Sequence, residues 1–356
     1  MILELDGLSH RYGDELAVED VSFGIESGEL LALLGPSGCG KTTIVQAIAG
    51  HVRPTAGRVL LRGEDATSIP PEDRRVGLVF QRPTLYPHMT VAENVEYGLT
   101  ARGFEADRRQ KLVAEYLDLV DLTAKRDAAP STLSGGQKRR VELARALAPQ
   151  PDVLLLDEPL SALDRTLRQR LREAIGRIQR ETGVATLFVT HDQADAMALA
   201  DRLVVLNEGR VSGIGPPRRL YTSPPNRFVA SFLGRSNVLS AEIVDKSPPT
   251  IDVADRTAVL DGETLAAPVG SRFTCHVRPE DLSLGSSSDD ASWLSIPAEV
   301  ESVADVGSRY DVTVRTTTGE ELVVEQSDPP PSVGQPVFVG VSREAVTVFG
   351  PEDRAD

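Results

Sequence analysis

The nine residues from Gly35 to Thr43 constrain this chain more than any other segment. They fit the pattern G-x-x-x-x-G-K-[ST] and directly follow the apolar run Leu30–Leu34. Glycines let the backbone curl until its N–H groups point at one anion, and the positive N-terminal end of the next helix adds to the attraction. We therefore predict a loop for the phosphates of a nucleoside triphosphate, with Lys41 on the β- and γ-phosphates and the Thr42 hydroxyl on Mg²⁺. The nucleotide-binding residues expected in this loop are Gly35, Pro36, Ser37, Gly38, Cys39, Gly40, Lys41, Thr42 and Thr43.

The overall composition predicts a globular protein with two or three domains. The chain has 356 residues, of which 40% are hydrophobic, enough to form real cores. No apolar run approaches the ~20 residues of a membrane-spanning helix, and Glu4 and Asp6 stand where a signal peptide would be basic and then apolar. The two cysteines, Cys39 and Cys275, form no disulfide or metal-ligand pattern. We therefore expect a protein that is not exported and that works in a reducing cytoplasm.

The chain is strongly acidic, with a formal charge of −15 and a pI near 4.9. This charge argues against nucleic acid as a partner, because DNA must be held through many phosphate contacts. Lysine supplies only five of the 38 basic residues, and arginine supplies the rest. Two explanations stay open: a GC-rich genome, and an acidic, lysine-poor surface suited to high cytoplasmic salt.

Apolar runs that alternate with helix-like segments predict a layered α/β domain over residues 1–235. The runs are nearly continuous, as in strands of a sheet that is covered on both faces. They are Leu30–Leu34, Val76–Phe80, Val153–Leu156, Ala185–Val189 and Leu203–Leu206. Between the second and third runs, apolar residues at helical spacing predict a helical subdomain over about residues 88–150. The positions that we assign there to core packing are Val91, Val95, Leu99, Val113, Leu117 and Val120.

From Asn237 onward the residue pattern changes, and the new pattern predicts a second, all-β domain over residues 236–356. β-branched residues alternate with polar ones, and Pro- and Ser-rich breaks separate the runs. Residues 312–324 predict a hairpin that turns near Gly319, and residues 337–341 predict a further strand. Such short strands at regular spacing favour small barrels of the oligonucleotide/oligosaccharide-binding type.

Asp157 and Glu158 follow the apolar run Val153–Leu156 directly. The end of such a strand places both carboxylates at the carboxyl edge of the sheet, beside the phosphate-binding loop. Asp157 then suits a contact with Mg²⁺, directly or through another ligand of the ion, whereas Glu158 suits acceptance of a proton from an attacking water. Two acids after a strand also commonly cap the next helix, but the phosphate-binding loop in the same chain favours the catalytic interpretation.

Ser134, Gly135, Gly136 and Gln137 precede a helix-like run that stops at Pro149. Ser134 and Gln137 fit a capping box, which satisfies free N–H groups at a helix start and requires no ligand. A capping box does not require two glycines between its members, however, and these leave the helix start open to an anion. We therefore predict a second phosphate site at these four residues.

With these motifs in this order, residues 1–235 resemble the ATP-binding subunit of an ABC transporter. The resemblance implies an α/β P-loop NTPase core with a helical subdomain, and an enzyme that hydrolyses ATP with Mg²⁺. It assigns Tyr12 to adenine stacking, Gln81 to Mg²⁺ and the attacking water, and His191 to the γ-phosphate. The D-loop of the family matches Ser161, Ala162, Leu163 and Asp164.

The resemblance also implies partners. Two copies of the chain would form a head-to-tail homodimer, with each ATP between the phosphate-binding loop of one copy and the Ser134–Gln137 signature of the other. Gln81 would report the nucleotide state to integral-membrane permease subunits, at the cytoplasmic face of the membrane. An extracytoplasmic solute-binding protein would be an indirect partner. Because Glu158 and a complete signature lie in one chain, such a homodimer would have two competent sites.

The all-β region narrows the resemblance to importer ATPases of the maltose, polyamine, ferric-iron and inorganic-anion groups, whose C-terminal TOBE barrels serve dimerisation or regulation. Residues 276–282 resemble a segment recurrent in those barrels, and residues 228–234 match the usual entry into them. Residues 235–239 depart from the form of the sugar importers, which favours polyamine, iron, thiamine or anion uptake. We therefore expect the ATPase of a binding-protein-dependent importer. A maltose-type sugar importer is one alternative; a non-transport ATPase of the same fold is another, against which the acidic charge counts.

Overall fold

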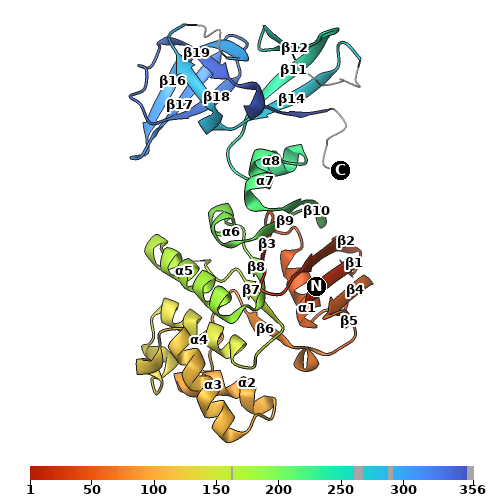
Figure 1. Ribbon diagram of the computed structural model, residues 1–356, viewed down its shortest axis with the longest axis vertical. Coiled ribbons are helices and arrows are strands. Elements are labelled where there is room, and N and C mark those ends of the chain that lie inside the picture. Colours follow the sequence, from red (N-terminus) through yellow and green to blue (C-terminus); the bar gives the residue numbers. More distant parts are fainter. Residues whose placement is uncertain (162, 260–267, 288–291, 351–356) are drawn as a thin grey trace. The chain divides into compact units, whose positions relative to one another are not determined.

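The computed structural model describes residues 1–161, 163–259, 268–287 and 292–350 (Figure 1). By packing, the chain divides into two compact units, Met1–Arg218 and Arg219–Asp356. The domain bounds expected from the sequence, 1–235 for the ATPase domain and 236–356 for the β-barrel domain, stay a prediction.

A six-stranded sheet lies at the centre of the first unit. Its order is β10-β9-β3-β8-β7-β6, and neighbouring strands are parallel except β9 and β10. The strands are β3 (Leu30–Leu34), β6 (Val76–Val79), β7 (Val153–Asp157), β8 (Ala185–Val189), β9 (Arg202–Asn207) and β10 (Arg210–Gly215). All five apolar runs therefore form strands, as predicted. One predicted end was wrong: β6 stops at Val79, and Phe80, outside the sheet, is 42% exposed.

An antiparallel sheet in the same unit was not identified from the sequence. Its order is β2-β1-β4-β5, formed by β1 (Leu3–Tyr12), β2 (Glu15–Ile25), β4 (Ala56–Leu61) and β5 (Glu64–Asp65). Bulges interrupt the pairing of β1 with β2, so the alternation of buried and exposed residues changes phase within β1. One apolar core joins this sheet, helix α1 (Lys41–Ala49) and the strands of the larger sheet.

Helices α2 (Val91–Ala101), α3 (Ala106–Leu119) and α4 (Gly135–Leu147) form the predicted helical segment and lie together in Figure 1. Thr90 begins α2 with a capping box, in which the N–H and the side chain of Glu93 both take part. The six apolar positions expected to pack in the core are all buried: Val91, Val95, Leu99, Val113, Leu117 and Val120.

Two more helices return the chain from the carboxyl ends of the central strands. Helix α5 (Arg165–Thr182) follows β7, and α6 (Gln193–Leu199) follows β8. Short 3₁₀ turns occur at Pro71–Asp73, Thr123–Lys125, Pro130–Thr132, Pro279–Asp281 and Arg343–Ala345. The connections before α5 and α6 carry the predicted site residues Glu158 and His191.

The described part of the second unit consists mainly of β-strands, and two short α-helices lie at its start, α7 (Pro217–Thr222) and α8 (Arg227–Phe232). One five-stranded sheet has the order β13-β12-β11-β14-β20 and the other β15-β19-β16-β17-β18, with antiparallel pairs in both. The strands are β11 (Asn237–Lys246), β12 (Pro249–Val253), β13 (Arg256–Val259), β14 (Arg272–Val277), β15 (Leu282–Gly285), β16 (Leu294–Asp305), β17 (Tyr310–Thr316), β18 (Glu321–Gln326), β19 (Pro336–Val341) and β20 (Thr347–Phe349). A single apolar core is shared by the two sheets. The predicted hairpin is β17–β18, so the OB-like, all-β prediction for this region is confirmed.

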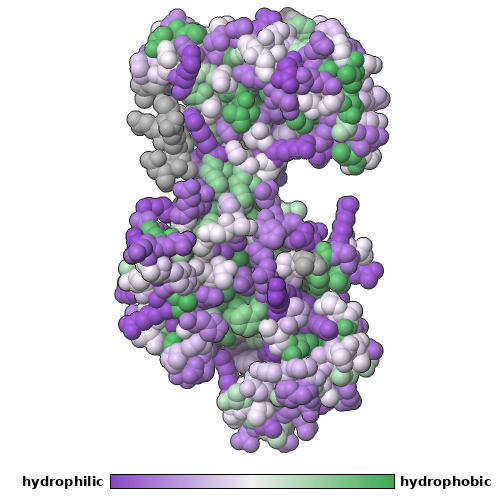
Figure 2. All heavy atoms as spheres, turned by 180° about the vertical axis from the view of Figure 1, so that it is seen from behind, coloured by the Kyte–Doolittle hydropathy of each residue, from purple (hydrophilic) through white to green (hydrophobic). Residues whose placement is uncertain are grey.

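Hydrophobic side chains occur as separate small groups in a mostly hydrophilic surface on the face shown in Figure 2. This distribution agrees with the acidic composition. Among the described residues, no helix combines the length and the apolar character required to cross a membrane.

Candidate functional site

The predicted phosphate-binding loop connects the end of β3 to the start of α1. Gly38 and Gly40 have φ values of +83° and +100°, which favour glycine. A Cβ on Gly40 would lie 2.6 Å from the Ala17 carbonyl oxygen, so neighbouring backbone also excludes a side chain there. Gly40 precedes α1 and has no side chain to cap it, which leaves the first N–H groups of the helix for an anion.

Lys41 is held inside this loop. Its residue is 7% exposed, and Nζ donates to the carbonyl oxygens of Gly35 and Pro36, at 2.8 Å each. The Cys39 sulfur lies 3.8 Å from the same nitrogen, and burial raises the pKa of its thiol. The loop therefore encloses one ammonium group, the charge that a polyphosphate requires.

Asp157 and Glu158 lie where the sequence predicted them, at the carboxyl end of β7. Asp157 pairs with Val189 of β8, and the Glu158 N–H donates to the Val189 carbonyl at 2.9 Å. Glu158 has a φ of +45°, a left-handed conformation that is uncommon for glutamate and clusters at functional sites. Burial, and then the charge of Glu158, raise the pKa of Asp157, while Lys41 opposes the shift.

Three predicted site residues from three different loops meet at the Glu158 carboxylate. Gln81 Nε2 donates to Glu158 Oε2 at 2.8 Å, and His191 Nδ1 lies 3.0 Å from Oε1. The loops follow β6, β7 and β8, whose parallel carboxyl ends meet at one edge of the sheet. Each carboxylate oxygen thus has its own partner, which fixes the orientation of the group.

The donor set suits a magnesium ion that arrives with a nucleotide. Thr42 follows Lys41 in the first turn of α1, and Asp157 and Gln81 come from the adjoining strand ends. Within the described ranges, no group of three or more His, Cys, Asp or Glu side chains could hold a metal by itself. Mg²⁺ commonly takes only one or two carboxylates and completes its shell with substrate phosphates and water, so these residues fit it.

The four residues Ser134–Gln137 form the capping box at the start of α4. Ser134 Oγ accepts from the Gln137 N–H at 3.3 Å, and Gln137 Oε1 accepts from the Ser134 N–H at 3.0 Å. A Cβ on Gly136 would lie 2.5 Å from a methyl group of Leu167, so a side chain there would require Leu167 to shift. Nothing lies within 4 Å of a Cβ built on Gly135, so the fold does not explain this second glycine.

In the described part of the chain, no hydrogen bond or ion pair joins this signature segment to Lys41 or Glu158. The structure therefore gathers the predicted site into two places within one chain. One holds the phosphate-binding loop with Gln81, Glu158 and His191; the other holds Ser134–Gln137.

The positions of Tyr12 and Asp164 do not by themselves indicate a role in nucleotide binding. Tyr12 is 49% exposed at the end of β1, and its hydroxyl donates to Gln46 Oε1 at 3.2 Å. Asp164 caps α5, where its Oδ1 accepts from the Leu167 N–H at 2.9 Å. Of the predicted D-loop, Ala162 lies outside the described residues. The adenine-stacking role of Tyr12 and the D-loop role of Asp164 stay predictions.

Sequence reasoning missed two charged residues that contact Asp192, Arg168 and Asp195, whereas the expected capping of α6 by Asp192 is confirmed. Arg168 of α5 donates to Asp192 Oδ2 at 2.6 Å, directly after His191, and lies 3.4 Å from Asp195 of α6. Asp195 is 1% exposed, and burial, followed by the charge of Asp192, raises its pKa. The available signal was a carboxylate within the short apolar helix after His191; the pattern alone gave no reason to treat it as buried.

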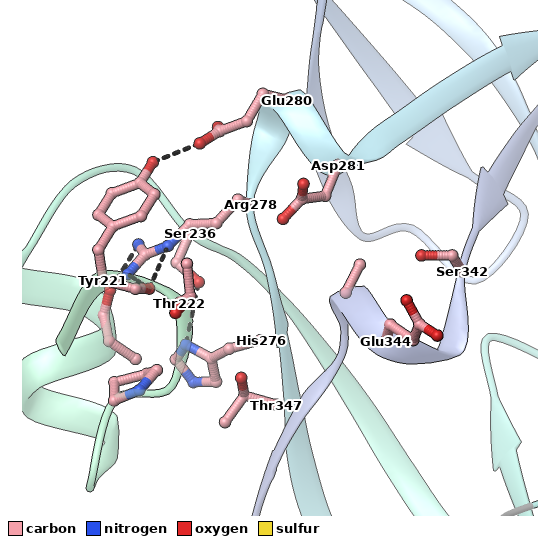
Figure 3. Close-up of a pocket in the computed structure, with 13 residues that line it drawn as sticks. Tyr221, Thr222, Ser236, His276, Arg278, Glu280, Asp281, Ser342, Glu344 and Thr347 are labelled. Atoms are coloured by element: carbon pink, nitrogen blue, oxygen red, sulfur yellow. Dashed lines mark hydrogen bonds between the residues drawn. The ribbon is translucent and has the colours of Figure 1, made fainter. Parts of the chain in front are cut away.

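Residues 276–282, which resemble a recurrent barrel segment, contribute side chains to the lining of a cavity of about 360 Å³ in the second unit (Figure 3). Arg278 donates to the carbonyl groups of Tyr221, Ala230 and Arg235 at 2.8–3.0 Å, and its guanidinium lies 4.1 Å from the centre of the Tyr221 ring. Burial, followed by Arg227 and Arg278, lowers the pKa of the neighbouring His276 to about 4. The segment thus ties the two short helices to the sheets within this unit.

Comparison with known families finds matches in both units. The family described as ABC transporter matches residues 18–161, and the family described as TOBE domain matches residues 276–349. The spermidine/putrescine import ATP-binding protein PotA of Acidothermus cellulolyticus is 43% identical over 318 residues, which cover 89% of this chain and 83% of the relative.

The name of another relative refers to the import of a different solute. The Fe(3+) ions import ATP-binding protein FbpC 1 of Rhizobium meliloti is 40% identical over 317 residues, or 88% of each chain. Among solved structures, cbiO1 of Clostridium perfringens, part of the ABC transporter complex cbiONQ, matches with a TM-score of 0.58 and 30% identity. That match covers 62% of this chain and 90% of cbiO1.

Proposed function

This chain belongs to the importer-type ATP-binding subunits of ABC transporters, which hydrolyse ATP, and we propose that it powers the uptake of a polyamine. The single observation that supports this solute is the likeness to spermidine/putrescine import proteins, which extends over 89% of the chain. Ferric iron is the second candidate, because an Fe(3+) importer subunit is 40% identical over a similar length.

In the proposed hydrolysis, Lys41 and the open N–H groups at the start of α1 bind the β- and γ-phosphates. The Thr42 hydroxyl, the Asp157 carboxylate and the Gln81 amide would hold Mg²⁺, which neutralises charge on the phosphates. A positive charge that binds beside Asp157 would oppose the rise in its pKa that burial causes, as Lys41 already does in part.

Glu158 is the proposed general base, which accepts a proton from the water that attacks the γ-phosphorus. Its carboxylate is oriented by Gln81 at 2.8 Å and His191 at 3.0 Å, and it is the point where the three loops meet. His191 contacts Glu158 through Nδ1, which leaves its second ring nitrogen, Nε2, for the γ-phosphate; the two nitrogens donate at the same time only in the protonated imidazolium. Positioning and charge neutralisation supply most of the acceleration in such a transfer.

The complete site is proposed to form between two copies of the chain. Ser134 and Gly135 of one copy would contact the γ-phosphate held by Lys41 of the other. Two observations support this arrangement: the start of α4 has a glycine at 135 that the fold itself does not require, and the segment makes no bond to the phosphate-binding loop of its own chain within the described ranges. The C-terminal unit is proposed to prolong the dimer or to regulate it.

The membrane partner is proposed to bind near the loop that follows β6. Tyr97 of α2 is 47% exposed, its ring centre lies 4.7 Å from that of Tyr86, and the Arg145 guanidinium lies 5.5 Å from the centre of the Tyr86 ring. Permease subunits docked at this surface would hold the ATPase at the cytoplasmic face of the membrane. They would receive solute from an extracytoplasmic binding protein.

The solute is tested in proteoliposomes that contain the chain with its cognate permease and solute-binding protein. We expect ATP-dependent uptake of labelled spermidine and no uptake of ferric iron, with Lys41→Ala as the inactive control. Uptake of iron or maltose in place of spermidine would contradict the polyamine proposal and leave the importer assignment intact.

A further inference from the structure

Helix α4 carries a buried ion pair that the hydrolysis mechanism does not use. Arg139 and Glu142 lie about one turn apart, their side chains are 5% and 1% exposed, and Arg139 Nη1 lies 2.9 Å from Glu142 Oε2. Burial of two charges costs free energy unless the remaining donors and acceptors are also satisfied. Both side chains find their other partners in the loop that follows β6 and carries Gln81.

The partners lie on consecutive parts of that loop. Arg139 donates through Nη2 to the Gln81 carbonyl at 2.6 Å and through Nη1 to the carbonyl of the preceding residue. Glu142 Oε1 accepts from the Thr84 N–H. Arg145, about one turn further along α4, donates to the Thr84 carbonyl at 2.8 Å and to its hydroxyl at 3.0 Å. One face of α4 therefore holds the loop backbone at both Gln81 and Thr84.

Helix α2 holds the far end of the same loop. Asn94 is fully buried; its Oδ1 accepts from the Tyr86 N–H at 2.8 Å, and its Nδ2 donates to the Thr90 carbonyl at 2.9 Å. Since β6 ends at Val79, residues 80–90 are bound by side chains of the helical segment and not by the ladder of the sheet. Helices α2 and α4 therefore hold this loop in place.

We propose that Arg139, Glu142 and Arg145 are positioning residues, which lock the Gln81 loop to the signature helix so that both move together. Ser134 caps the start of α4, and Arg139 lies in the second turn of the helix. When the start of α4 docks on the partner's ATP, the same helix sets Gln81 against Glu158 of its own chain. ATP binding in one composite site thereby affects the position of Gln81 in the other. The inference rests on the proposed function, because it takes Ser134 to contact the nucleotide of a second copy.

The test is a double-mutant cycle between Arg139→Lys and Gln81→Ala in the full chain. Lysine keeps the charge but cannot place two donors on adjacent carbonyls as a guanidinium does. Because a displacement of about 1 Å can cost about 10²-fold, we expect Arg139→Lys to lower kcat roughly 10- to 100-fold, with KM for ATP nearly unchanged. In the Gln81→Ala background the same substitution should lower kcat less than about 2-fold, because both changes act through one amide.

Arg140→Lys is the matched control on the same helix. Arg140 lies next to Arg139, but its Nη1 pairs with Asp121 Oδ2 at 3.2 Å and does not contact the loop, so kcat should stay within about 2-fold of the parent chain. If Arg139→Lys does not fold, Arg145→Met replaces it in the cycle. Arg145 is only partly buried, and its loss removes the two bonds to Thr84; we expect kcat to fall roughly 3- to 10-fold.

Independent, multiplying effects of Arg139→Lys and Gln81→Ala on kcat would overturn the inference, because a purely structural residue acts in that way. A slow Arg139→Lys with a Gln81→Ala variant of normal rate would overturn it as well. Failure of the proposed dimer shows in a different experiment, the loss of complementation between Lys41 and Ser134 variants, so the two failures can be told apart.

Discussion

Replacement of Glu158 by glutamine separates the basicity of this side chain from its geometry. The amide has the same shape and keeps an oxygen that can accept from Gln81 Nε2, now at 2.8 Å from Oε2. The contact to His191 Nδ1, at 3.0 Å, is the one at risk, because the amide NH₂ replaces an acceptor. Loss of one hydrogen bond is worth about 0.5–1.5 kcal/mol, or at most roughly tenfold in rate.

Loss of a general base is larger, at about 10²–10⁴-fold, so the two causes can be distinguished by magnitude. We expect Glu158→Gln to bind ATP normally, to lose roughly 10²–10⁴-fold in hydrolysis, and to accumulate as an ATP-bound dimer. Initial rates, ATP affinity and sizing chromatography with ATP measure the three quantities. Glu208→Gln is a matched control, since Glu208 also has a positive φ, +46°, but lies exposed after β9. Near-normal turnover together with a monomer in ATP would remove Glu158 from the base role.

Three other predictions concern salt, domain organisation and pH. If the acidic surface is adapted to salt, the melting temperature should keep rising with KCl well beyond physiological strength; a plateau by ~0.2 M, where the Debye length is already below about 8 Å, favours the GC-rich explanation. A chain that ends near Gly234 should bind ATP with unchanged affinity and lose dimer lifetime, whereas a folded truncation without ATP binding contradicts the division of labour. A parallel version ending at Arg218 avoids leaving α7 and α8 without the sheets of their unit. The pKa of His276, lowered from 6.5 to about 4, means that only the unfolded chain binds this proton between those values, so stability should fall as pH falls through this window. His276→Asn should flatten that slope in acid-unfolding curves, and an unchanged slope refutes the assignment.

The nucleotide loop was predictable from local sequence because glycine positions there are set by the backbone itself. Gly40 needs both a φ of +100° and room beside Ala17, and no other residue satisfies both. The buried strands were also predictable, since a parallel sheet covered on both faces reads as a continuous apolar run. Phe80 was misassigned because an apolar residue directly after such a run has the same pattern whether or not the sheet continues.

Long-range and buried polar features were harder to predict. Strand β1 contains a bulge near Gly7, with a φ of +60°, which breaks the two-residue alternation that identifies strands. Arg139 and Glu142 were not identified from the sequence, because a pattern cannot show that their partners are backbone groups of a loop about 58 residues away. The family resemblance assigned Gln81 and His191 to the nucleotide site, but it did not predict that both contact Glu158, and nothing in their spacing indicates it.

The most direct test of the account is hydrolysis by a mixture of two inactive chains, Lys41→Ala and Ser134→Ala. The account takes each active site to combine the phosphate-binding loop of one copy with the signature segment of another. A heterodimer of the two variants then contains one intact site, formed by the Lys41 of the Ser134→Ala chain and the Ser134 of the Lys41→Ala chain. We predict that each variant alone is inactive and that the mixture recovers ATP hydrolysis. No recovery, in a mixture where heterodimers are shown to form, would contradict the composite site.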